Sequence, residues 1–108
     1  MTLVFLDDEP DLCDLYESLF ANDSRKVVTF TEPEAAINYF EKGVCDFCFI
    51  DYHLGSVLGT SVRESLPDNV KCVLVTGEAG IKTPEGFIDV LEKPFDFDEF
   101  DAYLEKIK

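Results

Sequence analysis

The sequence predicts an α/β fold in which a doubly wound, five-stranded parallel sheet carries helices on both faces. Five apolar runs recur along the chain and alternate with segments of helical period. The runs are too continuous for a sheet with one solvated face, whereas strands that are buried on both faces read in this way. At 108 residues, 46% of them hydrophobic, residues 1–108 are expected to form one domain around a single core.

Each expected strand is an apolar run bounded by polar or turn-forming residues. The predicted strands are Thr2–Leu6, Lys26–Phe30, Asp46–Ile50, Lys71–Val75 and Phe87–Leu91.

The first helix is expected to begin near Pro10 and to end in Asn22-Asp23-Ser24. Spacings of three and four predict one inward stripe of Leu12, Leu15, Tyr16, Leu19 and Phe20. The second helix opens with Thr31 and Glu34 in the register of a capping box. It is expected to turn Ala36, Ile37 and Phe40 inward and to stop at Gly43.

The third helix has to fit between Gly59 and Pro67, so it is short, with Val62 and Leu66 as its apolar contacts. Residues 77–86 contain internal breakers and no amphipathic repeat, so the fourth helix is expected to be short or absent. The last helix is predicted over 96–108 because its early residues are acidic and its late ones basic. Its inward stripe is expected to be Phe97, Phe100, Leu104 and Ile107.

The chain is strongly acidic, with 9 Lys and Arg against 23 Asp and Glu and a formal net charge of −14. Such a charge repels nucleic acid and anionic lipid, and it favours a divalent cation or a partner with a basic face. Solubility alone would also explain it. No apolar stretch approaches the roughly 20 residues of a membrane span, and the acidic residues at 7–9 interrupt any signal-peptide core. We therefore expect a cytoplasmic protein that binds neither nucleic acid nor membranes.

The four cysteines are expected to be free thiols in a reducing compartment. Cys13, Cys48 and Cys72 lie inside apolar runs, as buried small residues do. Cys45 and Cys48 have CxxC spacing but enter a strand, whereas a redox pair favours a helix start. A structural zinc site would need a second pair of ligands, and His53 is the one histidine.

Polar residues of different kinds end four of the strands. Asp7 and Asp8 follow the first strand, Asp51 the third, Thr76 the fourth and Lys93 the fifth. Ligands of open parallel sheets bind at the carboxyl ends of the strands, so these side chains are expected to converge. Clustered carboxylates need a hard cation such as Mg²⁺, while Lys and Thr suit phosphoryl oxygens and a carboxylate can be a phosphoryl acceptor. Taken singly, each residue would also fit a turn, a cap or an exposed surface.

In this combination the residues resemble the receiver domain of two-component response regulators. The resemblance runs from Leu3-Val4-Phe5-Leu6-Asp7-Asp8-Glu9-Pro10 through Asp51 and Thr76-Gly77 to Lys93-Pro94-Phe95. It implies a flavodoxin-like (βα)₅ fold with strand order 2-1-3-4-5.

The resemblance also implies a role for each residue at the strand ends. Asp51 would accept a phosphoryl group from a sensor histidine kinase or a histidine phosphotransfer protein and thereby switch the binding of a downstream partner or pass the group on. Asp7, Asp8 and Asp51, with the backbone carbonyl of His53, would hold Mg²⁺. Thr76 and Lys93 would bind the phosphoryl oxygens, and Gly77 would keep the approach open. Glu9, His53 and Glu78 would tune the lifetime of the phosphoryl group. Such a protein is not an enzyme beyond catalysing its own phosphorylation and dephosphorylation.

The sequence departs from the family pattern at three places. The spacing from Thr76 to Lys93 is short, Val90 replaces the usual aromatic residue three positions before the lysine, and Gly55 replaces the usual proline after the acceptor. Phosphorylation would then be read out through the first helix or through the loop Gly77–Gly86.

Two other functions stay open on the sequence. A receiver fold could serve as a phosphorylation-independent interaction or dimerisation module, which Val90 and the missing helix favour and the intact acidic set opposes. A Mg²⁺-dependent phosphatase of the haloacid dehalogenase type also uses an aspartyl phosphate. That family needs an Asp-x-Asp motif, which Asp7-Asp8-Glu9 does not provide.

Overall fold

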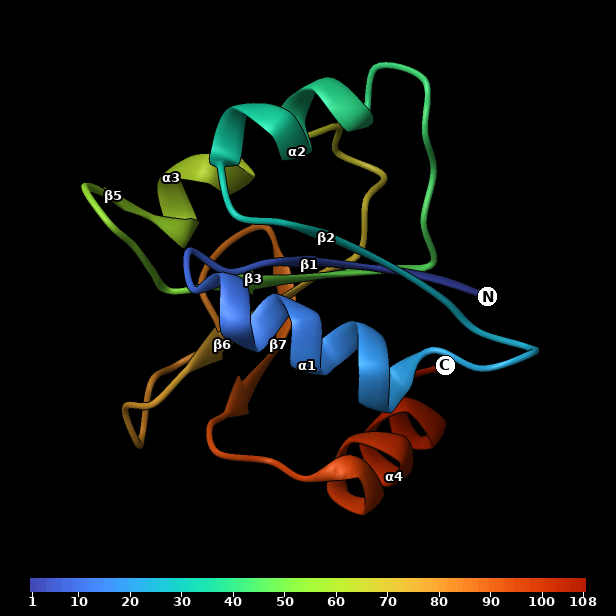
Figure 1. The fold of residues 1–108 in the computed structure, drawn as a ribbon. Helices are drawn as coiled ribbons and strands as arrows, with labels where there is room; N and C mark the ends of the chain where they lie inside the picture. Colours follow the sequence, from blue (N-terminus) through green and yellow to red (C-terminus); the bar gives the residue numbers. More distant parts are fainter.

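The computed structural model, which describes residues 1–108, shows a five-stranded parallel sheet with helices on both faces (Figure 1). The sheet runs in the order β2-β1-β3-β6-β7 and consists of β1 (Thr2–Leu6), β2 (Lys26–Phe30), β3 (Phe47–Asp51), β6 (Cys72–Thr76) and β7 (Phe87–Glu92). The helices are α1 (Pro10–Phe20), α2 (Pro33–Tyr39), α3 (Gly59–Arg63) and α4 (Phe97–Ile107). Counted along the chain, the five sheet strands have the predicted order 2-1-3-4-5, which confirms the fold.

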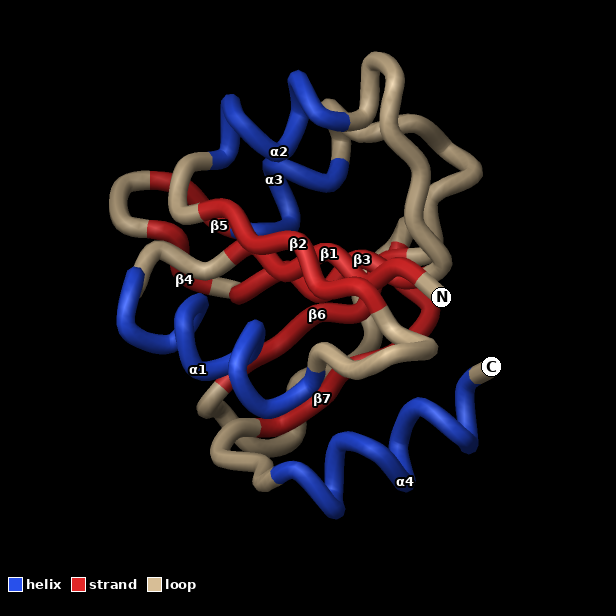
Figure 2. The backbone as a smooth tube through the Cα atoms, turned by 45° about the vertical axis from the view of Figure 1, so that its right-hand side comes forward, coloured by secondary structure: helices blue, strands red, loops and turns tan.

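Helices α1 and α4 lie on one face of the sheet, and α2 and α3 lie on the other (Figure 2). Under α1 and α4 the core is largely aromatic: Phe5 stacks on Tyr16 at 4.5 Å between ring centroids, and Phe20 stacks on Phe100 at 4.1 Å. The core under α2 and α3 is mostly aliphatic, with Phe40 and Phe87 as its buried aromatic residues. Packing on both faces fixes the register of β1 and β3, whose carboxyl ends carry the predicted acidic residues.

Three strands differ from the prediction, by one residue at each shifted boundary. Strand β3 begins at Phe47 and includes Asp51, β6 begins at Cys72 and includes Thr76, and β7 extends to Glu92. Asp46 lies just before β3, and its carboxylate accepts a hydrogen bond from the Thr2 amide at 2.6 Å. The structure also contains a two-stranded hairpin that the sequence did not predict, formed by β4 (His53–Leu54) and β5 (Val57–Leu58).

The inward face of α1 is narrower than predicted. Tyr16 and Phe20 are buried together with Cys13, whereas Leu15 and Leu19 are 48% and 42% exposed. The prediction was wrong for these two leucines because no helix covers the flank on which they lie. In α4, Phe97 is likewise 40% exposed.

The capping box predicted at the start of α2 is absent. The helix begins at Pro33, its N-cap residue is Glu32, and no side chain caps it. Pro33 accounts for the difference, because the residue before a proline is held in extended conformation and a proline suits the first helical position. A capping box does form at α4, where Asp96 and Glu99 exchange hydrogen bonds.

Residues 77–86 contain no helix, as predicted, and the side chain of Arg63 holds the end of this loop. Its guanidinium donates to the carbonyl oxygen of Gly86 at 2.8 Å. The other donors of Arg63 bond to the carbonyl oxygens of Leu66, Pro67, Asp68 and Val70 at 3.2–3.3 Å. One buried side chain therefore closes the α3 turn and ties it to the entry of β7. None of the helices is long and apolar enough to cross a membrane.

Candidate functional site

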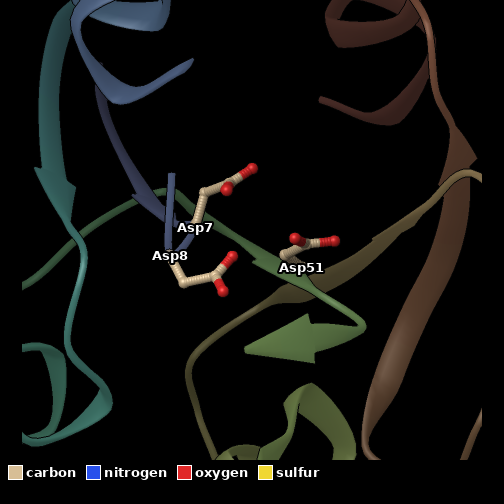
Figure 3. A group of neighbouring side chains, drawn as sticks. All are labelled: Asp7, Asp8 and Asp51. Atoms are coloured by element: carbon tan, nitrogen blue, oxygen red, sulfur yellow. The ribbon is translucent and has the colours of Figure 1, made fainter. Parts of the chain in front are cut away.

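Three carboxylates meet at the carboxyl ends of β1 and β3 (Figure 3). Asp7 and Asp8 follow β1, Asp51 ends β3, and the two strands are paired directly, with Leu6 opposite Ile50. One oxygen from each carboxylate lies within 4.8 Å of the others. Asp7 is buried, Asp8 is exposed, and Asp51 is intermediate. A set of hard oxygen donors, open on one side, fits Mg²⁺.

Lys93 is the single cation in this acidic cluster. Its Nζ lies 3.0 Å from Asp7 Oδ2 and 3.4 Å from Asp51 Oδ2. The Lys93 backbone is anchored at the same edge, because its N–H donates to the carbonyl oxygen of Thr76 at 2.7 Å. Burial alone would lower the pKa of Lys93, but the hydrogen bond and charge of Asp7, together with Asp51, outweigh it and the pKa is raised. Lys93 is therefore a fixed positive charge beside Asp51.

The environment of Asp51 opposes its ionisation. Burial raises its pKa, Lys93 counteracts this, and the nearby Asp7 and Asp8 add to the rise, so that the net pKa is above the ordinary value of 3.8. Three carboxylates therefore share one ammonium group. A divalent cation would relieve this imbalance, which is a second reason that the donor set fits Mg²⁺.

Thr76 ends β6 and is buried, with its hydroxyl oxygen accepting a hydrogen bond from the Glu78 amide at 3.1 Å. No protein atom accepts the proton of this hydroxyl, so it is free to donate to an anion. A Cβ at Gly77 would meet no heavy atom within 4 Å. The space next to Thr76 is therefore open, as the predicted approach of a phosphoryl group requires.

The three residues predicted to tune the site lie at its rim. His53 Nε2 is 3.1 Å from Glu78 Oε1, and both side chains are more than half exposed. They contact each other across the mouth of the site, from β4 and from the loop after β6. Glu9 is exposed and contributes its backbone N–H, which donates to Asp7 Oδ1 at 3.0 Å. A tuning role for the three side chains, and a ligand role for the His53 carbonyl, stay predictions.

Two residues of the site were missed from the sequence. The hydroxyl of Tyr16 donates to Asp7 Oδ2 at 3.4 Å, although the residue was predicted to be only part of an apolar stripe. Gly59 packs against the end of β3, where an added Cβ would overlap the carbonyl oxygen of Asp51. No spacing or motif distinguishes a tyrosine that uses its oxygen from one that only packs, or a glycine under a strand end from an ordinary helix start.

An apolar groove of about 210 Å³ adjoins the site on the side of α1. Helix α1 and the segment that leads into α4 form its walls, with Leu12, Leu15, Tyr16, Leu19, Phe20, Lys93, Pro94 and Phe95 as lining residues. Leu15 and Leu19 are the exposed leucines of α1. Lys93 and Tyr16 belong both to this groove and to the acidic cluster.

Comparison with known families decides the identity. The family model described as the response regulator receiver domain matches residues 3–105. The chain belongs to this family. The match spans all four strand ends that carry the acidic, threonine and lysine residues. No curated protein matches the chain.

Solved structures of other receivers share the fold at low sequence identity. A CheY-like receiver domain from Methylobacillus flagellatus has a TM-score of 0.84 at 19% identity, and the alignment covers 100% of this chain and 98% of that chain. The response regulator TrrA from Thermotoga maritima, in complex with Mg²⁺ and BeF, has a TM-score of 0.83 at 20% identity over 99% and 98% of the two chains. A complex of the histidine kinase ThkA with TrrA matches with a TM-score of 0.81 at 21% identity over 97% and 96%.

Proposed function

We propose that this receiver domain is a Mg²⁺-dependent phosphoacceptor, in which Asp51 takes a phosphoryl group from a phosphohistidine of a kinase or phosphotransfer protein. The observation that carries the proposal is the cluster itself: the Asp51 carboxylate lies beside two further carboxylates and 3.4 Å from the Lys93 ammonium. The related receiver TrrA in complex with Mg²⁺ and BeF supports the choice of cation and of ligand chemistry. The structural match to a chain from the complex of the histidine kinase ThkA with TrrA supports a histidine kinase as the phosphoryl donor.

In the proposed transfer, a carboxylate oxygen of Asp51 attacks the phosphorus of the phosphohistidine. A P–O bond forms, the P–N bond breaks, and the histidine nitrogen leaves with its electron pair and is reprotonated by solvent. Asp7, Asp8 and Asp51 would hold Mg²⁺, which would supply positive charge at the phosphoryl oxygens. Lys93 contributes a second positive charge, and the Thr76 hydroxyl donates a hydrogen bond to another oxygen. Hydrolysis of the resulting acyl phosphate by water restores Asp51, so the protein catalyses only its own phosphorylation and dephosphorylation.

The groove beside α1 is the surface that we assign to the phosphodonor. Two exposed apolar side chains, Leu15 and Leu19, line this groove together with Lys93. The protein as a whole is acidic, with a formal net charge of −14. Such a surface suits a donor helix with an apolar stripe and basic flanks.

Readout of the phosphorylated state is expected to use α1 or the loop 77–86. Val90 has no large ring to move, and the segment between β6 and β7 contains no helix that could serve as a docking surface. Alanine scanning of the loop tests the second option: partner binding that survives every substitution would exclude the loop.

We place the protein in the cytoplasm, because four free thiols suit a reducing compartment.

The decisive experiment is the intact mass of the protein after incubation with a phosphohistidine donor or a small acyl phosphate. One added phosphoryl group is expected with Mg²⁺ and none after chelation of the metal. Asp51→Asn should abolish the gain. Asp23→Asn, which changes an exposed aspartate in the turn before β2, is the matched control and should retain it. Mass gain that survives in Asp51→Asn, or no gain in the wild type, would overturn the proposal.

A further inference from the structure

Tyr16 makes a contact that its packing does not require. Its ring is buried in the aromatic core, stacked on Phe5 at 4.5 Å and on Phe20 at 5.8 Å between ring centroids. A phenylalanine would satisfy these stacks equally well. The hydroxyl is therefore the distinctive part of the residue, and it points to the acidic cluster rather than to solvent.

The one hydrogen-bond partner that the structure gives this hydroxyl is Asp7 Oδ2, at 3.4 Å. A buried hydroxyl without a hydrogen-bond partner would be destabilising. Tyr16 and Asp7 are both buried, so neither can readily replace this hydrogen bond with one to water. A tyrosine hydroxyl is protonated at neutral pH, so it donates this hydrogen bond and the carboxylate oxygen accepts it.

Asp7 is held from three directions. Its Oδ1 accepts from the Glu9 amide at 3.0 Å, while Oδ2 accepts from Lys93 at 3.0 Å as well as from Tyr16. The donors from Glu9 and Lys93 come from segments at the open end of the sheet, whereas Tyr16 is fixed in the core on α1. Tyr16 is thus the only one of the three that ties the carboxylate to the rigid interior.

We propose that Tyr16 is a positioning residue for Asp7, whose hydroxyl fixes the orientation of the carboxylate for the cation that Asp7, Asp8 and Asp51 bind. The inference rests on the proposed function, because it assumes that these carboxylates bind Mg²⁺. Carboxylate ligands are commonly oriented by hydrogen bonds from groups that do not touch the metal, and loss of such a group typically weakens metal binding by about 10- to 100-fold. The long contact at 3.4 Å places Tyr16 at the lower end.

Tyr16→Phe removes the oxygen and leaves the ring. The structure offers a matched control in Tyr103, on α4, whose hydroxyl donates to Asp89 Oδ2 at 2.8 Å. Tyr103→Phe is the same chemical change at a shorter hydrogen bond to a carboxylate outside the cluster. Comparison of the two separates a general effect of losing such a bond from an effect on the site.

The measurement is the dissociation constant for Mg²⁺, by calorimetry or by amide NMR titration, with thermal unfolding of the metal-free proteins recorded alongside. Tyr16→Phe should keep the native spectrum and raise the constant about 10-fold, while Tyr103→Phe leaves it within about two-fold. Unchanged Mg²⁺ affinity in Tyr16→Phe would overturn the inference. So would an equal loss in Tyr103→Phe, or a Tyr16→Phe protein that does not fold, since the hydroxyl would then be structural.

The intact-mass experiment on the wild type separates this inference from the proposed function. A wild type that takes up phosphoryl in Mg²⁺, with normal Mg²⁺ affinity in Tyr16→Phe, would refute the role of Tyr16 alone. A wild type that binds no Mg²⁺ would refute both.

Discussion

Gly59 is the position where the smallest change is expected to disturb the site most. It is the first residue of α3, and its N–H donates to the carbonyl oxygen of Tyr52 at 2.7 Å, one residue past Asp51. In Gly59→Ala, the new methyl group would overlap the carbonyl oxygen of Asp51 and lie 2.9 Å from Ile50 Cγ2. Carbon–carbon contacts are optimal at about 3.5–4.0 Å, so α3 and the end of β3 would have to separate by about 1 Å.

The expected cost follows from two opposing effects. Alanine is favoured over glycine inside a helix by about 1 kcal/mol, whereas overpacking against an immobile strand costs about 1–3 kcal/mol. The overlap involves backbone atoms, which have little freedom to yield, so the net effect should be a loss of about 1–2 kcal/mol of unfolding free energy. Displacement of a reacting group by about 1 Å can cost about 100-fold in rate, so phosphorylation of Asp51 should slow by about 10- to 100-fold.

Two assays on the same protein test this expectation: urea unfolding, and the rate of phosphorylation by a small acyl phosphate in Mg²⁺. Gly77→Ala serves as the control for stability, because a Cβ there meets nothing within 4 Å, and it should change the unfolding free energy by less than about 0.5 kcal/mol. A Gly59→Ala protein that is as stable as the wild type and is phosphorylated at the same rate would refute the reasoning.

Three further predictions concern Arg63, Asp51 and Cys13. Arg63→Lys keeps the charge but cannot reach all five carbonyl oxygens that Arg63 binds, so urea unfolding should show a loss of about 2–4 kcal/mol. A loss under about 0.5 kcal/mol would contradict a stabilising role of these hydrogen bonds. The pKa of Asp51 is raised on folding, so the folded state binds its proton more tightly and the wild type should lose stability relative to Asp51→Asn as pH rises above the ordinary value of 3.8. An unfolding difference between them that stays constant with pH would argue against this. Burial raises the pKa of Cys13 from 9.0 to about 11. A disulfide reagent should therefore modify this thiol at least about 100-fold more slowly in the native than in the unfolded protein, as followed by peptide mass. Equal modification rates would count against the burial of Cys13.

Much of the fold could be predicted because its signals are local and repeated. Apolar runs predicted the bounds of all five sheet strands to within one residue, and the helix-breaking residues in 77–86 predicted that no full helix forms there. The hairpin after Asp51 was not predicted, because its strands have two residues each and neither carries a recognisable period. The exposure of Leu15 and Leu19 was also missed, since periodicity shows which residues share a helix face but not whether another element covers it.

The candidate site was predictable to the extent that it lies at strand ends. Pairing of adjacent parallel strands brings Asp7, Asp8 and Asp51 together without further information. The ion pairs of Lys93 depend on how its long side chain reaches from the end of β7, past β6, to Asp51 and Asp7, and the Tyr16 hydroxyl bond depends on the rotation of α1. Such contacts arise from tertiary packing, which leaves no spacing in the sequence to read.

The central claim is that Asp51 is a working, Mg²⁺-dependent phosphoacceptor. Its most direct test is the amide NMR spectrum in Mg²⁺ before and after addition of beryllofluoride, a phosphoryl mimic that does not hydrolyse, with Asp51→Asn as the control. We expect shifts at Asp51, Thr76 and Lys93 that require Mg²⁺ and are lost in the variant. A wild-type spectrum that is unchanged by Mg²⁺ and beryllofluoride would contradict the claim.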